Sequence, residues 1–418
     1  MRRFVHVRLL LLVFILIIDI YLYFVLRFLT QNYSQKIRLT VFSLHWLVSL
    51  ATIISLFVLG GLEARTRNYV LTFVVGILIA KLLTVAVLLL DETRRGIFWT
   101  IKRMVPEKTA AQISSGENIP RSSFLVWLGM IFGASFLGVF IYGLSNKYNY
   151  RIRTVKINFP NLPKAFKGLK IVQLSDIHSG SFSDKAAVRK GVEMVLNEKP
   201  DLILFTGDLV NDRAIEMENY TDLFSQLKAP LGVYSSLGNH DYGDYYDWKS
   251  PEAKAQNLED LKKLQAAMGW KLLMNEHVIF ERQGEKIALI GIENWGAKGH
   301  FPKYGKLDLA CIGTEDIPFK ILMSHDPSHW DAQVRPEYPA IDLALAGHTH
   351  GMQFGVELPH FKWSPIQYMY KQWAGLYQQG KQYLYVNRGY GFLGYPGRVG
   401  ILPEITVIEL GCGEFSTS

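Results

Sequence analysis

Four long apolar stretches constrain the first third of this 418-residue chain more than any other feature. They run over residues 9–26, 39–62, 69–90 and 124–144, and only Asp19 and Lys81 place a charge inside them. A helix of roughly 20 residues spans the hydrocarbon core of a bilayer, whereas a cleaved signal peptide would explain only the first stretch. We therefore predict an all-α region of four transmembrane helices over residues 1–148. The alternative is a hydrophobic helical domain packed in water.

The two charges inside these stretches have two interpretations. Ionisable residues within the hydrocarbon often mark an ion or proton pathway, which would make the region a transporter regulated by the rest of the chain. The stretches contain just these two charged residues and no relay of carboxylates. The sequence therefore favours a structural role, such as an ion pair between Asp19 and Lys81.

The net charge of +8 is concentrated in the same region, while residues 151–418 are slightly acidic. A basic excess beside apolar runs indicates a membrane surface, and an acidic domain lacks the basic track that nucleic acid requires. The connections 27–38 and 91–123 carry slightly more Lys and Arg than the opposite side. Residues 120–125 also look like a twin-arginine export signal that has lost one arginine. We predict a multi-pass integral membrane protein whose residues 151–418 lie outside the cytoplasm.

Residues 149–418 have the pattern of an α/β domain. Short apolar runs of strand length alternate with helix-like stretches at 183–197, 214–227 and 251–268, which indicates layers of helices on sheets. Cys311 and Cys412 are the only cysteines, which excludes a disulfide scaffold and a cysteine-based zinc site. The predicted strands are 153–159 (an edge strand by its alternation), 169–174, 202–205, 232–237, 287–290, 319–323, 343–346, 383–387 and 404–409.

Five of the predicted strands end in side chains that bind metals. In order, these side chains are Asp176 and His178, then Asp208, then Asn239 and His240, then His325, and finally His348 and His350. Loops at the carboxyl ends of strands in an open α/β sheet converge on one crevice, so we expect these residues to meet. Asp, Asn and His together suit Mn²⁺, Fe or Zn²⁺ better than copper. Glycines at 207, 238 and 347 fit tight turns and a close approach of the backbone to a ligand.

The motifs Asp-x-His, Gly-Asp, Gly-Asn-His-Asp, Ser-His and Gly-His-Thr-His, in this order, resemble the calcineurin-like metallophosphoesterase superfamily. Residues 169–178 and 385–405 look like its bacterial membrane-anchored branch. The resemblance implies a four-layer α/β sandwich of two mixed sheets that holds two divalent metal ions. It implies one ion on Asp176, His178 and His350, a second on Asn239, His325 and His348, and Asp208 as the bridge between them. It also implies that His240 stands beside the substrate and that Asp241 orients its ring.

The function implied by the resemblance is that of a membrane-anchored phosphohydrolase acting on a phosphorylated small molecule or lipid. A metal-bound hydroxide would attack a phosphoester or pyrophosphate bond, and His240 would donate a proton to the leaving oxygen or stabilise the transition state. Arg388 and Arg398, in glycine-rich loops, are candidates for binding the substrate phosphate or else are solvated loop arginines.

The remaining alternatives concern the substrate and the class of function. The aromatic segment 358–377 fits either an apolar rim facing the bilayer, suited to a lipid-linked substrate such as a nucleotide-diphospho-lipid, or an ordinary packed flap. The alternative function is a non-catalytic sensor or scaffold that binds a ligand with the same fold. Loss of the bridging Asp or of the Asn-His pair would favour it, but both are present.

Overall fold

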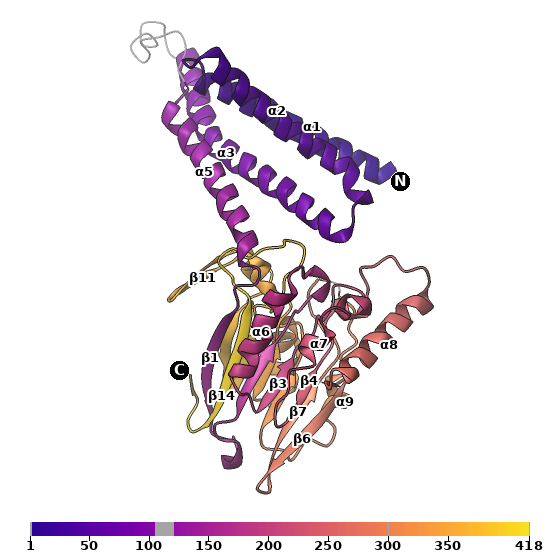
Figure 1. Ribbon diagram of the computed structural model, residues 1–418. Coiled ribbons are helices and arrows are strands. Elements are labelled where there is room, and N and C mark those ends of the chain that lie inside the picture. Colours follow the sequence, from indigo (N-terminus) through magenta and orange to yellow (C-terminus); the bar gives the residue numbers. More distant parts are fainter. Residues whose placement is uncertain (1, 105–120, 300, 418) are drawn as a thin grey trace. The chain divides into compact units, whose positions relative to one another are not determined.

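The computed structural model describes residues 2–104, 121–299 and 301–417. The chain divides into two compact units, Met1–Tyr142 and Gly143–Ser418, shown as ribbons in Figure 1. The predicted boundary after residue 148 falls a few residues later than this division. Pro120 and much of the connection 91–123, on which the predicted sidedness depends, lie outside the described residues.

The first unit consists of four long apolar helices in the part that the structure describes, so the predicted all-α region is confirmed. The helices are α1 (Arg2–Leu29), α2 (Gln35–Val58), α3 (Ala64–Met104) and α5 (Ser123–Gly143). Each contains a segment long and apolar enough to cross a membrane: Leu9–Leu29, Gln35–Gly61, Arg65–Ile101 and Ser123–Asn146. Helix α3 continues well past the predicted end at residue 90. Ion pairs one turn apart, Asp91 with Arg94 and Glu92 with Arg95, support this polar extension.

Asp19 and Lys81 form an ion pair inside the first unit. The Lys81 ammonium lies 2.6 Å from Asp19 Oδ1, and the Asp19 side chain is fully buried. Lys81 also donates to Ser49 Oγ at 3.3 Å, and His45 Nε2 lies 3.0 Å from the Asp19 carbonyl oxygen. These contacts connect α1, α2 and α3. This agrees with the structural role that the sequence predicts for the two charges.

Replacing Lys81 by methionine is expected to destabilise the first unit by about 3–5 kcal/mol, because it leaves the buried Asp19 carboxylate without its partner. The double replacement Asp19→Leu with Lys81→Met should be much milder, since it removes both charges together. Thermal unfolding of the full-length protein in detergent measures the difference. A double variant no more stable than Lys81→Met would contradict the pairing argument.

The second unit contains two mixed sheets. The larger one has the strand order β15-β1-β14-β2-β3-β4-β5, in which β2, β3, β4 and β5 are parallel and β14 is parallel to β1 but antiparallel to β2. The smaller one has the order β12-β13-β9-β8-β7-β6, with a parallel centre and antiparallel edges. The strands of the first sheet are β1 (Arg151–Phe159), β2 (Lys170–Leu174), β3 (Leu202–Phe205), β4 (Val233–Ser235), β5 (Lys271–Leu272), β14 (Glu404–Cys412) and β15 (Ser416–Thr417). Those of the second are β6 (Glu276–Arg282), β7 (Glu285–Gly291), β8 (Lys320–Met323), β9 (Leu343–Ala346), β12 (Gly375–Gln379) and β13 (Gln382–Val386).

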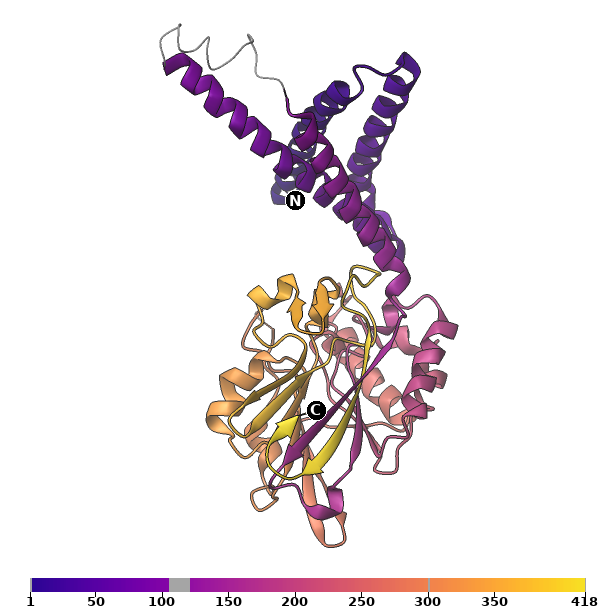
Figure 2. The ribbon, with the colours of Figure 1, turned by 90° about the vertical axis from the view of Figure 1, so that its left-hand side faces the viewer.

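Three apolar cores define four layers, which Figures 1 and 2 show as two sheets between helices. The core between the sheets contains alternate strand residues such as Ile171 and Leu345. Their neighbours in the strands, such as Val172 and Ala346, face the helices on the outer sides. The first sheet is covered by α6 (Lys185–Asn197), α7 (Thr221–Phe224) and α8 (Pro251–Ala267). The second is covered by α9 (Leu307–Cys311) and the π-helical turn Trp330–Val334, which continues into the short α10 (Arg335–Glu337).

Three expectations about the second unit were wrong in detail. Strand β1 is not at the edge, because the short β15 pairs with Ile157 and Asn158 on its outer side. The stretch 214–227 is not one helix but a 3-10 turn (Ala214–Met217) followed by the short α7, since Tyr220 leaves the helical conformation between them. Strands β6 and β12, and the small hairpin of β10 (Val356–Leu358) and β11 (Phe361–Trp363), were not predicted. Cys311 and Cys412 are both free.

Candidate metal centre

The candidate site lies where the two sheets present the carboxyl ends of their parallel strands. Asp176 and His178 follow β2, Asp208 follows β3, and Asn239 and His240 follow β4. From the other sheet, His325 follows β8, and His348 and His350 follow β9. Parallel neighbours end on the same side of a sheet, which brings these loops together as predicted.

The first group of donors consists of Asp176, His178 and His350, all buried, with ligand atoms within 4.8 Å of one another. His350 Nε2 lies 3.2 Å from Asp176 Oδ1 and 3.0 Å from His178 Nε2. Two imidazole nitrogens that face each other beside a carboxylate form a donor set that suits one divalent cation.

The second group consists of Asp208, His325 and His348, again within 4.8 Å of one another. Asn239 joins it, because its Oδ1 lies 2.9 Å from His348 Nδ1. Asp208 connects the two groups: its Oδ2 is 3.1 Å from His325 Nε2 and 3.5 Å from His178 Nε2. The position of this carboxylate between the groups suits a ligand shared by two ions.

The backbone at five of these seven donors is in the left-handed region, which residues with a side chain rarely adopt. The φ angles are 53° at Asp176, 47° at His178, 61° at Asp208, 68° at His348 and 49° at His350. Each such conformation costs on the order of 1–3 kcal/mol and persists where the surrounding structure enforces it, typically at functional sites. The concentration of this strain at the predicted ligands is independent support for a functional centre.

The glycines named from the sequence permit the close packing of these loops. Gly207 has a φ of 97°, and Gly347 leaves no room for a Cβ, which would overlap the Asp176 carboxylate. A Cβ at Gly238 would overlap Asp208 in the same way. At Gly238 and Gly347 the backbone thus approaches carboxylates of the donor set, while its close approach to a ligand stays a prediction.

The electrostatics prepare the donors for a cation. Burial alone would raise the pKa values of Asp176 and Asp208, but the imidazoles around them hold both below the ordinary range. Burial lowers the pKa values of His178 and His348, so their rings are neutral. Ionised carboxylates and neutral imidazoles are the forms that bind metals.

His325 differs from the other imidazoles. Burial alone would lower its pKa, but Asp208 and Asp176 raise it to about 10. Its ring therefore carries a proton beside Asp208 when no cation is bound, and metal binding would release that proton. The donor chemistry and the distances above fit a pair of divalent ions.

His240 lies beside the two groups, but the predicted role of Asp241 is wrong. His240 Nδ1 is 2.7 Å from the carbonyl oxygen of Asn211, which orients the ring in place of Asp241. The Asp241 carboxylate is buried and accepts hydrogen bonds from the backbone N–H groups of Asp208, Leu209 and Gly238. Burial and the nearby Asp208 raise the pKa of Asp241 to about 7. Asp241 thus positions the loop that carries Asp208.

Arg388 and Arg398 also have roles other than the predicted ones. Both are buried. Arg388 forms ion pairs of 2.5 Å with Glu404 and with Glu357. Arg398 donates to the carbonyl oxygens of Arg388 and Gly391 and lies 3.3 Å from His350 Nδ1. Because these donors are already used inside the protein, the structure argues against a contact of either arginine with a substrate phosphate.

Three residues at the site were not singled out from the sequence. The Tyr370 hydroxyl lies 3.0 Å from His348 Nε2 and 3.3 Å from Asp326 Oδ2. The Tyr245 hydroxyl accepts a hydrogen bond from Asn239 Nδ2 at 2.9 Å. Asp326 directly follows His325, so the Ser-His motif at this strand end could have pointed to Asp326 as a site residue. Tyr370 belongs to the aromatic segment 358–377, in which Ile366, Tyr370 and Trp373 pack together while residues 358–362 and 368–369 are exposed.

Comparisons with known proteins agree with this geometry. The family model "Calcineurin-like phosphoesterase" matches residues 169–352, and the model "Probable Calcineurin-like phosphoesterase, transmembrane domain" matches residues 1–147. The metallophosphoesterase YkuE of Bacillus subtilis is 32% identical over 60% of this chain and 81% of its own length.

Two further relatives have transmembrane or lipid-related names. A zebrafish (Danio rerio) transmembrane protein with a metallophosphoesterase domain is 32% identical over 65% of this chain, and the match spans 60% of that protein's length. The UDP-2,3-diacylglucosamine pyrophosphatase LpxG of Chlamydia trachomatis is 28% identical over 57% of this chain and 84% of its own length.

Proposed function

Because the chain belongs to the calcineurin-like phosphoesterase family, we propose that it is a membrane-anchored hydrolase of phosphoester or pyrophosphate bonds that depends on two divalent ions, Mn²⁺, Fe or Zn²⁺. The observation that carries the proposal is the position of Asp208, whose Oδ2 lies within 3.5 Å of a histidine from each donor group. A shared carboxylate is what a two-ion centre for phosphoryl transfer needs.

The residues divide into two ligand sets. Asp208 belongs to both sets, and the backbone N–H of His348 donates to both oxygens of Asp176 at 3.0 Å, which holds the two loops in register. When bound, two such ions neutralise the phosphoryl oxygens and lower the pKa of water for the attack on phosphorus. The proposed ligands are Asp176, His178 and His350 for the first ion and Asn239, His325 and His348 for the second.

His240 is proposed to act on the substrate and not on the ions. Its Nδ1 is held by the Asn211 carbonyl oxygen, and its ring lies 4.6 Å from that of Tyr245, so the ring orientation is fixed. Its backbone N–H donates to Asp208 Oδ1 at 2.9 Å, which keeps it next to the shared carboxylate. Nε2 is then the atom that donates a proton to the leaving oxygen or stabilises the charge of the transition state.

The proposed substrate is a lipid-linked phosphoester or pyrophosphate, such as a nucleotide-diphospho-lipid. The support is the four membrane spans together with the name of the Chlamydia relative, a pyrophosphatase of a UDP-linked diacylglucosamine. We further propose that the second unit is outside the cytoplasm. A reporter fused to the C-terminus, active on one side of the membrane only, tests that placement.

The test of the function uses the purified full-length protein in detergent. After chelation, each of Mn²⁺, Fe²⁺ and Zn²⁺ is added back, and turnover is measured on a panel of lipid phosphomonoesters, phosphodiesters and pyrophosphates. We expect activity to disappear with the metal and to return with at least one of the ions. Metal binding without turnover on any substrate would favour the sensor or scaffold instead.

A further inference from the structure

The hairpin of β10 and β11 has its apolar face turned outward. Val356 pairs with Trp363 and Leu358 with Phe361, whereas Glu357 pairs with Lys362 between them. Side chains alternate along a strand, so the two apolar pairs share one face and the charged pair shares the other. Leu358 and Phe361 are 59% and 56% exposed. In a sheet with one face in water, the polar side chains normally face the water and the apolar side chains face the protein.

The charged face of the hairpin is fixed to the protein. Glu357 forms ion pairs of 2.5 Å with Arg388 and 2.6 Å with Arg153. Lys362 Nζ donates to the Ala374 carbonyl oxygen at 2.5 Å. The hairpin cannot turn its apolar face inward without breaking these contacts. Contiguous exposed apolar residues of this kind mark an interaction surface.

The hairpin starts beside the end of the fourth membrane span. Residues 143–146 close the span Ser123–Asn146 and belong to the second unit. The Arg398 N–H donates to the Gly143 carbonyl oxygen at 2.9 Å, and the Gly355 N–H, just before β10, donates to the Val399 carbonyl oxygen at 2.9 Å. Figure 2 shows the hairpin and the loop near residue 399 at the same end of the second unit. The interfacial region of a bilayer begins where such a span ends.

We propose that the apolar face of the β10–β11 hairpin contacts the interfacial region of the lipid bilayer that the fourth span crosses. Trp363 Nε1 of β11 donates to the Tyr368 hydroxyl at 3.5 Å, and Tyr368 and Met369, which are 78% and 56% exposed, directly precede the buried Tyr370. Since the Tyr370 hydroxyl touches His348, these residues lead from the membrane contact to the candidate metal centre. If the proposed function holds, the centre receives substrates whose anchor stays in the membrane.

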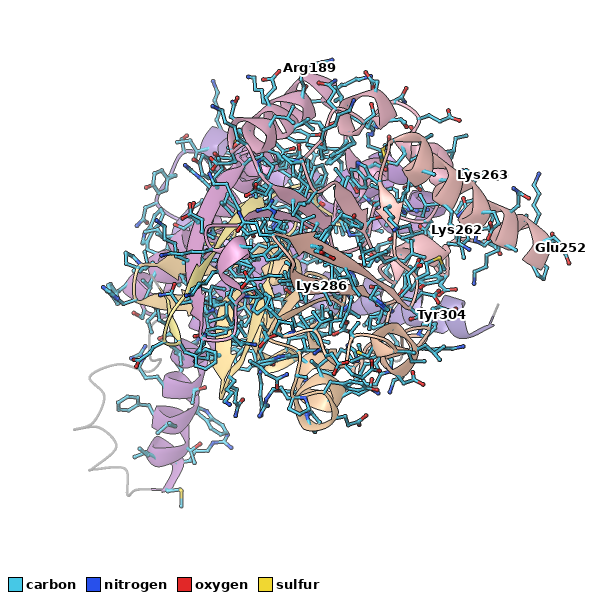
Figure 3. The ribbon with its side chains drawn as sticks, turned by 90° about the horizontal axis from the view of Figure 1, so that it is seen from below. Arg189, Glu252, Lys262, Lys263, Lys286 and Tyr304 are labelled. Carbon is cyan, nitrogen blue, oxygen red and sulfur yellow. The ribbon has the colours of Figure 1, made fainter. Side chains whose placement is uncertain are left out.

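The first test measures membrane contact without any activity. Leu358→Cys, in a background of Cys311→Ser and Cys412→Ser, is spin-labelled in the full-length protein in nanodiscs of phosphatidylcholine and phosphatidylglycerol. The control label is at Lys286→Cys. Lys286 is exposed, and Figure 3 labels it on the end of the second unit that faces the viewer. We expect the ratio of collisions with oxygen to collisions with a soluble nickel chelate to be several-fold higher at 358 than at 286.

Two outcomes overturn the proposal. Equal ratios at the two positions would place Leu358 in water. Protection from both reagents, or dipolar coupling between labels in separate copies, would show that protein and not lipid covers the hairpin.

The second test separates membrane contact from catalysis. In Leu358→Glu with Phe361→Glu, we expect the KM for a lipid phosphoester in vesicles to rise several-fold while kcat on a soluble aryl phosphodiester is retained. Lys286→Glu is the control for added negative charge and should change neither value. An unchanged KM for the vesicle substrate would contradict the role of the hairpin in delivery. A wild-type protein inactive on both substrates would overturn the proposed function, while the label measurement still decides the membrane contact.

Discussion

Replacing Asp208 by alanine is expected to abolish turnover and to lower the amount of bound metal. Its Oδ2 lies within 3.5 Å of a histidine of each donor group, so its loss affects both proposed ions together. Activity should fall by more than about 10³-fold, the scale on which a site loses its main electrostatic contribution. Metal content per protein and turnover of the full-length enzyme measure the two effects.

His348→Ala is the companion variant, because it removes a donor from the second group only. We expect it to lose turnover as well and to retain more metal than Asp208→Ala. Asp222→Ala, at an exposed carboxylate of the same unit, serves as the control and should match the wild type. Wild-type metal content with full activity in Asp208→Ala would refute the assignment.

His240→Ala is expected to retain metal but to lower kcat by about 10²–10⁴-fold, the usual contribution of a positioned acid or base. The side chain contacts the Asn211 carbonyl oxygen, and it is the backbone N–H, kept in the variant, that holds Asp208. The measurement compares kcat for an alkyl and an aryl phosphodiester. A larger loss with the alkyl leaving group would identify proton donation, since a poor leaving group depends on it most.

Two outcomes with this variant would contradict the proposed role of His240. An unchanged kcat on both substrates would remove His240 from the mechanism. Reduced metal content would instead show that it acts as a ligand.

The architecture and the donor set were predictable because each follows from the local sequence and from one general rule. The rule is that loops at the carboxyl ends of parallel strands lie at the same edge of a sheet. Apolar runs form strands such as β3 and β9. Parallel pairing aligns the strand ends within each sheet, and the apolar core between the sheets brings Asp208 and His348 together from positions far apart in the chain. The loops after these strands were recognisable because Gly-Asp and Gly-His-Thr-His combine a tight turn with a metal donor.

The roles of Asp241 and Arg388 were not predictable in this way. A carboxylate next to a histidine in sequence looks like its partner, but the turn after Asn239 directs Asp241 toward the backbone of Asp208. Arg388 looks like a loop arginine until the fold places Glu357 and Glu404 on either side of it. Strand β6 escaped prediction because its half-exposed residues lack a continuous apolar pattern.

The position of β14 has a consequence for synthesis. This strand comes late in the chain yet lies between β1 and β2, two of the earliest strands of the second unit. A ribosome therefore delivers this internal strand after all the others of the sheet except the short β15, and until residues 404–412 emerge, β1 and β2 expose unpaired edges of the kind that aggregate. A chain that terminates prematurely, even after every metal donor has been translated, would be left with a split sheet.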